Sequence, residues 1–390
     1  MFDIEELFNE IDKKNKPINE ISNDENKTLE NFLENIELYI GDYAKDRAIK
    51  SGNEILALCS EYEDYLNNED IFLYYKAYGK FLTLDIEESI YYIEKAIEIN
   101  KDAYEYYQLR ADCYEELNDN KEAINNYLLS YELNKKNFKT LKGLAFILLQ
   151  EGDITEALTY FEKALEIEDT DHNLIAGISS CYLLRADFNK ALEYITRAIE
   201  LDEKEVSYRL NRAVIYNLLM QTDKAIEECK KIIEINPSFY IAHYTLVDFL
   251  LQEVRINEAE KILKDIIELK TKHSMAYVKL SQCNLMKDNC EKALEYINKA
   301  IEMEPLNVEY YQKRAVIYRA LNDFESAEKD YLDILEIDSN NWFIYCLIGN
   351  FYMEYEKYEK ALIYLEKALS LNKDNSEIIS DIEICKENIN

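Results

Sequence analysis

The sequence predicts an all-α protein in which pairs of short helices are stacked along the chain. A period of 34 residues runs through most of the sequence without insertion or deletion, which indicates small repeated units rather than one globular core. Among 390 residues there are only 7 Gly and 3 Pro, too few turn formers for a β-rich fold. The period is marked by Ala123, Ala157, Ala191, Ala225, Ala259, Ala293, Ala327 and Ala361.

Composition and charge narrow the class of partner. The chain carries 45 Lys and Arg against 78 Asp and Glu, and its net charge of −33 disfavours nucleic acid and membrane surfaces as partners. Hydrophobic residues make up 48% of the chain, which argues against disorder. No secretory signal or membrane-spanning run is visible. Eight Cys without paired spacing indicate reduced thiols, so we expect a cytoplasmic protein.

The chain begins with an amphipathic segment and a linker, residues 1–35. A polar stretch from Pro17 to Lys27 separates the apolar residues of this segment from the rest of the chain. Two interpretations of residues 1–13 stay open: an extra capping helix, or a tethered peptide that fills the groove of this array or of a neighbouring molecule. The apolar residues follow the i, i+3, i+4, i+7 spacing of a helix face and are Ile4, Leu7, Phe8 and Ile11.

The two ends of the array are expected to be capped. Residues 36–69 have the length of one unit and carry a degenerate apolar pattern, so we expect an N-terminal capping repeat there. Residues 376–390 read as a closing C-terminal helix with a polar outer face, which Ile384 interrupts. The apolar stripe of this closing helix is Ile378, Ile382, Cys385 and Ile389.

Residues 172–205 illustrate the repeating unit. Two apolar stripes at helical spacing flank a polar break at Asp187, which predicts two helices of about 13 residues. Helices this short cannot bury their apolar faces alone, so each unit depends on its neighbours. The first stripe is Ile175, Ile178, Ser179 and Tyr182, and the second is Ala191, Tyr194, Ile195, Ala198 and Ile199.

Unit positions 8, 20 and 27 carry small residues, positions 11 and 24 carry aromatic residues, and proline occurs at position 32, as at Pro237 and Pro305. In these features residues 70–375 resemble tetratricopeptide repeat proteins, with nine consecutive units. The resemblance implies a right-handed α-solenoid superhelix of antiparallel helix pairs whose first helices line a concave groove. Two departures from the family pattern are Ser89 at position 20 and Val247 at position 8.

The nine units form three blocks of three, 70–171, 172–273 and 274–375. Each block carries an arginine at position 7 of its second unit. These arginines could bind an acidic partner, but we expect them to pair inside the repeat with position 23, because a buried arginine needs a partner. The expected pairs are Arg110 with Asn126, Arg212 with Glu228 and Arg314 with Asp330.

By resemblance, the groove is lined by unit positions 2, 5, 6, 9, 12 and 13. These positions hold seven acidic and five basic residues, so the groove is nearly neutral, and about half of its residues are apolar or aromatic. Such a surface is typical of an interaction site unless the chain itself covers it. The expected protein-binding residues are Ile71, Tyr74, Tyr75, Tyr78, Phe81, Lys142, Phe146, Asn211, Tyr244 and Asn350.

Two kinds of site are not expected. The carboxylate clamp of chaperone-adaptor proteins is absent, since Lys142 at position 5 is followed by Phe146 at position 9, and Asn350 at position 9 is preceded by Cys346. A metal site is not expected because the three histidines, at 172, 243 and 273, share no face with other ligands. No phosphate-binding loop or catalytic motif occurs, so we expect neither a cofactor nor an enzyme.

We therefore expect a non-catalytic protein–protein interaction scaffold or adaptor that binds a peptide or protein segment in the concave groove. The acidic convex face favours basic partners. A regulatory subunit of an enzyme complex and a self-associating scaffold are the alternatives. The sequence does not determine the oligomeric state.

Overall fold

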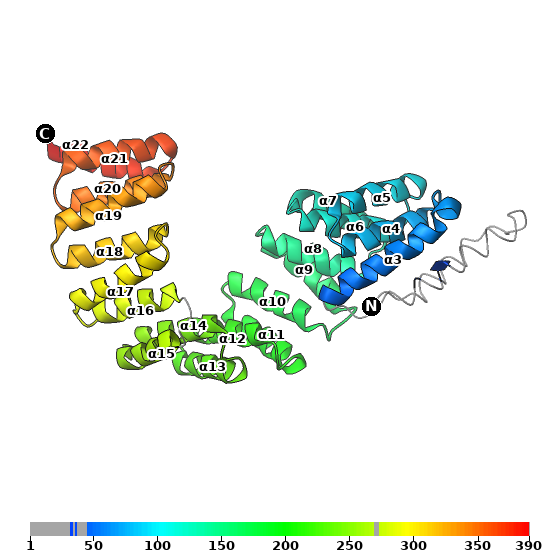
Figure 1. Ribbon diagram of the computed structural model, residues 1–390, viewed down its shortest axis with the longest axis horizontal. Coiled ribbons are helices and arrows are strands. Elements are labelled where there is room, and N and C mark those ends of the chain that lie inside the picture. Colours follow the sequence, from blue (N-terminus) through cyan, green and yellow to red (C-terminus); the bar gives the residue numbers. More distant parts are fainter. Residues whose placement is uncertain (1–31, 34–35, 37–44, 269–272, 390) are drawn as a thin grey trace, which may run out of the picture. The chain divides into compact units, whose positions relative to one another are not determined.

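The computed structural model describes residues 32–33, 36, 45–268 and 273–389, and these form helices joined by short turns (Figure 1). Residues 1–13, for which two interpretations were open, lie outside this range. The helices are α3 (Lys45–Leu66), α4 (Asp70–Leu82), α5 (Ile86–Ile99), α6 (Tyr104–Glu116), α7 (Asn120–Leu133), α8 (Phe138–Gln150), α9 (Ile154–Leu165), α10 (His172–Leu184), α11 (Phe188–Leu201), α12 (Val206–Leu218), α13 (Thr222–Ile235), α14 (Tyr240–Gln252), α15 (Ile256–Glu268), α16 (Ser274–Leu285), α17 (Cys290–Met303), α18 (Val308–Ala320), α19 (Phe324–Ile337), α20 (Trp342–Glu354), α21 (Tyr358–Leu371) and α22 (Ser376–Ile389).

The chain divides into two compact units, Met1–Tyr208 and Arg209–Asn390. Within each unit successive helices pack as antiparallel pairs, and a first helix also contacts the first helix of the next repeat, as α4 contacts α6 and α14 contacts α16. The predicted all-α fold of stacked helix pairs is confirmed. None of the described helices has the length and apolar character that crossing a bilayer requires.

The turn between the two helices of a repeat has the same backbone geometry in all nine repeats. Position 15 has a positive φ and closes the first helix: the amide of Asn118 donates to the carbonyl of Glu115, and that of Asp119 donates to Tyr114. Only one of the nine residues is glycine. They are Leu84, Asn118, Gly152, Ala186, Met220, Val254, Asp288, Asn322 and Glu356.

The small residues at positions 8 and 20 bring the two helices of a repeat into close contact. Three serines at these positions show this directly, because each hydroxyl donates across the pair to the carbonyl oxygen of the opposing alanine. The bonds run from Ser89 to Ala77, from Ser179 to Ala191 and from Ser281 to Ala293, each at 2.8 Å. The predicted role of the alanine series is confirmed, since all eight alanines are buried.

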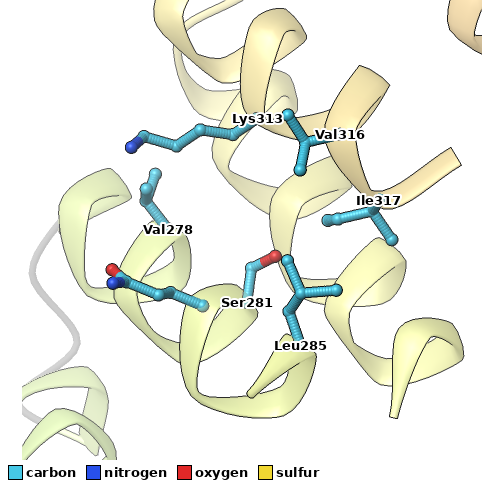
Figure 2. A pocket seen from close by; sticks show the side chains of 7 residues that line it. Val278, Ser281, Leu285, Lys313, Val316 and Ile317 are labelled. Atoms are coloured by element: carbon cyan, nitrogen blue, oxygen red, sulfur yellow. The ribbon is translucent and has the colours of Figure 1, made fainter. Parts of the chain in front are cut away.

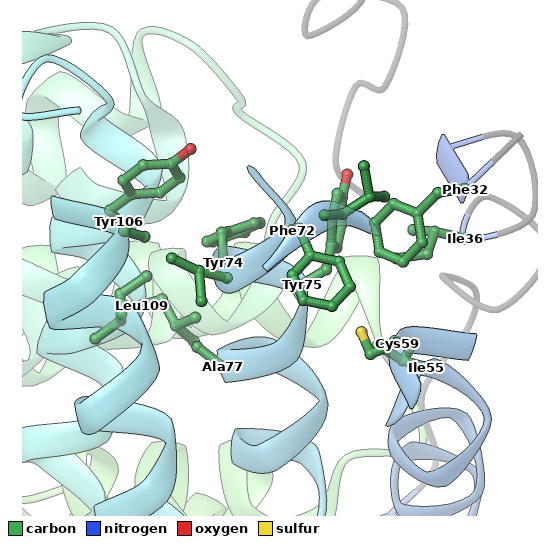
Figure 3. Packing of buried hydrophobic residues seen from close by; sticks show 14 of the residues in the cluster. Phe32, Ile36, Ile55, Cys59, Phe72, Tyr74, Tyr75, Ala77, Tyr106 and Leu109 are labelled. Carbon is green, nitrogen blue, oxygen red and sulfur yellow. The ribbon is translucent and has the colours of Figure 1, made fainter. Parts of the chain in front are cut away.

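At the N-terminal end, the packing begins before residue 36, the expected start of the capping repeat. Phe32, Leu33 and Ile36 are buried against α3 and α4 (Figure 3). The ring of Phe32 lies between those of Phe72 and Tyr62, with centroid distances of 5.3 and 5.6 Å. The capping layer therefore includes residues that were assigned to the linker.

The C-terminal helix α22 covers the last repeat, as expected. Ile378, Ile382 and Cys385 are buried against α20 and α21. Ile384 is exposed, as expected, but Ile389 is exposed as well, so the buried stripe ends one turn before the end of the helix.

The predicted pairing inside the repeats is confirmed for all three arginines. Nε of Arg110 donates to Oδ1 of Asn126 at 2.6 Å. In the other two blocks the partner is a carboxylate: the distance is 3.0 Å from Arg212 to Glu228 and 2.6 Å from Arg314 to Asp330. The three arginine side chains are thus engaged by partners inside their own repeats.

Candidate protein-binding groove

The first helices carry the groove positions, and the structure shows how far these side chains are open. The aromatic group expected to bind a partner in the first repeat is largely closed. Tyr74 and Tyr75 are only 4% and 6% exposed, so they are not available for binding, which corrects the expectation. Ile71, Tyr78 and Phe81 are partly buried against the same cluster.

Two contacts within the chain close this part of the groove. The ring of Tyr74 stacks on Tyr106 of the next repeat, with a centroid distance of 5.2 Å. The ring of Phe32 meets Tyr75 edge-on at 6.1 Å, so Phe32 lies over the first repeat (Figure 3). Aromatic side chains at positions 5 and 6 are long enough to reach the neighbouring layer, and they bury area there rather than face solvent.

Lys142 and Phe146 on α8 are also engaged within the chain. Nζ of Lys142 lies 2.5 Å from Oδ2 of Asp171, and both groups are largely shielded. The ring of Phe146 meets that of Phe161 edge-on at 4.9 Å. A Cβ on Gly177 would lie 2.6 Å from Cζ of Phe161, so the glycine makes room for this aromatic pair.

The groove face of α6 carries a carboxylate pair that the sequence analysis did not single out. The hydroxyl of Tyr127 donates to Asp112 at 2.5 Å and to Glu115 at 3.0 Å. Gly143 makes this possible, because a Cβ there would lie 2.6 Å from Cζ of Tyr127. Burial, with Glu115 as a further cause, raises the pKa of Asp112 to about 6. The sequence feature that could have indicated this pair is Tyr127 at position 24, followed by Gly143 at position 6 of the next repeat.

In the unit Arg209–Asn390 the groove face is more open. Asn211 and Asn350 are exposed, as expected for groove residues. Tyr244 is partly buried, and its hydroxyl is 3.3 Å from Nδ1 of His273. Apolar side chains on the first helices, or directly after one in the case of Met286, are also exposed here, namely Leu218, Ile241, Met286, Val316 and Phe343.

The charges on this open part of the groove are paired with one another. Two pairs join neighbouring first helices: Lys279 lies 2.5 Å from Asp248, and Arg319 contacts Glu354. The third pair, Lys313 with Glu309, lies along α18 at 3.1 Å. The groove of this unit is therefore nearly neutral, as predicted. Because its charges are paired, the exposed apolar side chains are the groups that remain available to a partner.

A cavity of about 270 Å³ opens between α16 and α18 in the same unit. Figure 2 shows the side chains pointing toward this common space from the two helices. The lining residues are Val278, Ser281, Gln282, Leu285, Lys313, Val316 and Ile317.

The described residues contain no group of three or more His, Cys, Asp or Glu side chains placed to hold a metal ion. All eight cysteines lie in the described part of the chain and are free thiols, and six of them are buried. Burial raises the pKa of Cys59 and of Cys113 to about 12, so these thiols stay protonated and act as core residues. The open groove and its cavity are the strongest candidate site in the described structure.

Curated relatives match only part of the chain. The Hsp70-Hsp90 organizing protein of Triticum aestivum is 28% identical over 139 residues, which is 35% of this chain and 24% of that protein. The anaphase-promoting complex subunit CDC16 of Saccharomyces cerevisiae is 32% identical over 97 residues, 23% of this chain and 12% of that protein. The chain thus spans about a quarter or less of the length of these two relatives.

A tetratricopeptide repeat protein from Parabacteroides merdae has a similar fold, with a TM-score of 0.50 and 20% identity over 64% of this chain and 98% of that one. Sequence models described as tetratricopeptide repeat match five stretches, which together make up more than half of the chain. The stretches are residues 104–137, 138–204, 221–283, 308–341 and 342–375. The chain therefore belongs to the tetratricopeptide repeat family.

Proposed function

We propose that this chain is a non-catalytic scaffold that binds a protein or peptide segment along the groove face of the unit Arg209–Asn390. The observation that carries the proposal is the set of exposed apolar side chains on the first helices of that unit, together with the cavity between α16 and α18. Apolar side chains that line a concavity and have polar groups around them are typical of interaction sites.

Because Tyr74 and Tyr75 in the first repeat are buried, we do not place the proposed binding site there. Their apolar area is already buried within the chain, so a partner would gain little there. In the second unit the same kind of area is still open to solvent and is available to a partner.

The distribution of charge suggests that the groove and the acidic surfaces outside it contribute differently to binding. The paired charges of the open groove favour contact with an apolar segment, whereas the net charge of −33 resides mainly on other surfaces. Those acidic surfaces would speed the approach of a partner with basic regions outside the bound segment. The free thiols are compatible with the cytoplasm, where we propose that the protein acts.

The named relatives fit this proposal and suggest one alternative. One is named as an organizing protein for Hsp70 and Hsp90, and another as a subunit of the anaphase-promoting complex. A role as a regulatory subunit of an enzyme complex would use the same groove. Self-association is the other alternative, and sedimentation at increasing concentration distinguishes it, since it requires a mass that rises with concentration.

The test replaces exposed apolar side chains in the groove and, as a control, on the other face. Ile241→Ser with Phe343→Ser changes groove residues that are 57% and 50% exposed. Ile363→Ser with Tyr91→Ser changes second-helix residues that are 66% and 52% exposed. Crosslinking mass spectrometry on the native complex should place partner crosslinks near α14, α16, α18 and α20. Binding should weaken only for the groove pair, and equal binding by both double variants would contradict the proposal.

A further inference from the structure

We propose that the cavity between α16 and α18 is the anchor subsite of the groove. Its occupant is a bulky aliphatic or aromatic side chain of a bound peptide that carries a carboxylate next to this anchor. The inference rests on the proposed function, because it specifies which peptides the groove would bind.

The size and lining of the cavity fit a single large side chain. At about 270 Å³ it is smaller than the roughly 300–1,000 Å³ of pockets that enclose whole small molecules. Val278 and Ile317 are buried, and Val316 and Leu285 are more open to solvent (Figure 2). The hydroxyl of Ser281 donates to the carbonyl of Ala293, so it does not need a polar partner in the cavity.

Burial of an apolar side chain in this space is favourable. Filling it removes from water the apolar atoms of the anchor and of the lining, which is favourable in proportion to the apolar area buried. Binding energy in peptide complexes concentrates on one or a few such buried anchors. The cavity is therefore the position in the open groove where a single side chain gains most.

Lys313 determines the charge that is favoured beside the anchor. It is the only charged residue among the seven that line the cavity. Its pair with Glu309 is open to solvent, with side chains 44% and 56% exposed, and such exposed pairs contribute little to stability. Exchanging Glu309 for a carboxylate of the peptide thus costs little, and burial under the peptide would strengthen the new contact.

The other cations of this part of the groove are less available. Lys279, whose side chain is only 13% exposed, lies 2.5 Å from Asp248. Arg319 is held by Glu354 from the next first helix. Repulsion by the acidic chain as a whole is screened beyond about 8 Å at physiological salt, whereas the contact at Lys313 is local.

The experiment is a selection of displayed random peptides on the full chain, followed by fluorescence anisotropy with synthetic copies of the enriched peptides. We expect the enriched peptides to share a bulky apolar residue next to Asp or Glu. Val316→Glu should weaken binding more than about tenfold, because it places a charge at the cavity. Gln282→Trp, which fills the cavity from an exposed position, should do the same.

Lys313→Gln should weaken binding by roughly three- to tenfold, and replacing the peptide carboxylate by an amide should have little further effect on this variant. Lys299→Gln is the matched control. Its pair with Glu295 is also spaced i, i+4, lies at 2.6 Å and has side chains 43% and 58% exposed, but it is on the second helix α17. This control should bind as the unchanged chain does.

The outcomes separate the two proposals. Enriched peptides that lack the shared anchor, or that bind Val316→Glu and Gln282→Trp unchanged, would overturn the anchor subsite. If such peptides still lose affinity with Ile241→Ser and Phe343→Ser, the groove remains the binding surface and only the anchor assignment fails. If neither set of variants changes binding, both proposals fail.

Discussion

Nη2 of Arg212 lies 3.0 Å from Oε1 of Glu228, across the two helices of one repeat. Glu228 is 4% exposed and also lies 3.7 Å from the guanidinium of Arg209 and 3.6 Å from Nζ of the exposed Lys231, so one buried carboxylate compensates two shielded guanidinium groups and one exposed lysine. Position 4 of the corresponding repeats holds a tyrosine, and the ring of Tyr107 packs against Arg110 at 5.5 Å. In the middle block, Arg209 occupies this position instead of a tyrosine. The two arginines of that repeat, Arg209 and Arg212, therefore both rely on the carboxylate of Glu228.

Glu228→Ala should therefore lower the free energy of unfolding by about 3–5 kcal/mol, because it leaves two largely buried guanidinium groups without a carboxylate. Chemical denaturation measures the loss, and hydrogen exchange should locate it in α12 and α13. The control is Glu227→Ala on the same helix. Glu227 is exposed and pairs only with Lys231, so its loss should stay below about 1 kcal/mol. A Glu228 variant as stable as this control would contradict the interpretation.

Val254→Gly should stabilise the protein. Val254 has a φ of 57° at position 15, and a β-branched residue in this left-handed conformation is strained by about 1–3 kcal/mol. Glycine removes the strain but loses more entropy on folding, by roughly 0.5–1 kcal/mol, so a net gain of about 1 kcal/mol is expected. A higher midpoint in thermal or urea denaturation is the measurement.

The reverse substitution at the equivalent turn tests the same cause. Gly152 has a φ of 85°, and a Cβ there would meet nothing within 4 Å. Gly152→Ala, which adds only this Cβ, therefore introduces no clash, and a loss of stability would come from the backbone conformation. Equal stability of this variant and the unchanged chain would show that the turn tolerates any residue.

The repeat register and the contacts inside a repeat could be predicted from the sequence. A small residue at position 8 must face a small residue at position 20 for the helices to approach, and the bond from Ser179 to Ala191 shows that they do. Asp330 could likewise be predicted as the partner of Arg314, because positions 7 and 23 lie on facing helices of one repeat. The small residues recur with the period of one unit and the arginine pair recurs once in each block of three units, so several copies carry each signal.

The exposure of the groove could not be predicted, because it depends on contacts between layers that do not repeat. Tyr75 occupies a groove position, yet Phe32, from outside the array, covers it. The left-handed turn position could not be predicted either, since only Gly152, Asn118, Asp288 and Asn322 among the nine residues are of the types that favour positive φ. The cavity between α16 and α18 arises from the sizes of seven side chains on two helices, and no single position encodes it.

Phe32→Ala should destabilise the first repeat and open its aromatic cluster. The ring is fully buried among Tyr62, Phe72 and Tyr75, and removing a buried phenylalanine ring costs about 3–5 kcal/mol. Hydrogen exchange should show the loss in α3 and α4, with α20 and α21 unchanged. Unaltered protection of α4 would mean that the cluster does not need residues before α3.

Asp112→Asn should stabilise the protein at neutral pH, with a gain that disappears in acid. Burial raises the pKa of Asp112 from 3.8 to about 6 in the folded chain, so the folded state binds this proton more tightly than the unfolded state does. The contribution of Asp112 to stability therefore falls as pH rises from about 4 to 6, and above pH 6 the full cost of the charge is present.

Asparagine is neutral at every pH and can still accept the bond from Tyr127. At pH 7.5 we expect a gain of up to about 3 kcal/mol in the free energy of unfolding, since the pKa rises by about two units and each unit corresponds to about 1.4 kcal/mol. At pH 4 the aspartate is itself protonated in the folded chain, so the two proteins should be nearly equally stable. Urea denaturation across this pH range measures the difference, with Asp187→Asn, which retains a helix cap, as the control. A gain that is constant with pH would show that the cost of the charge at Asp112 is not its cause.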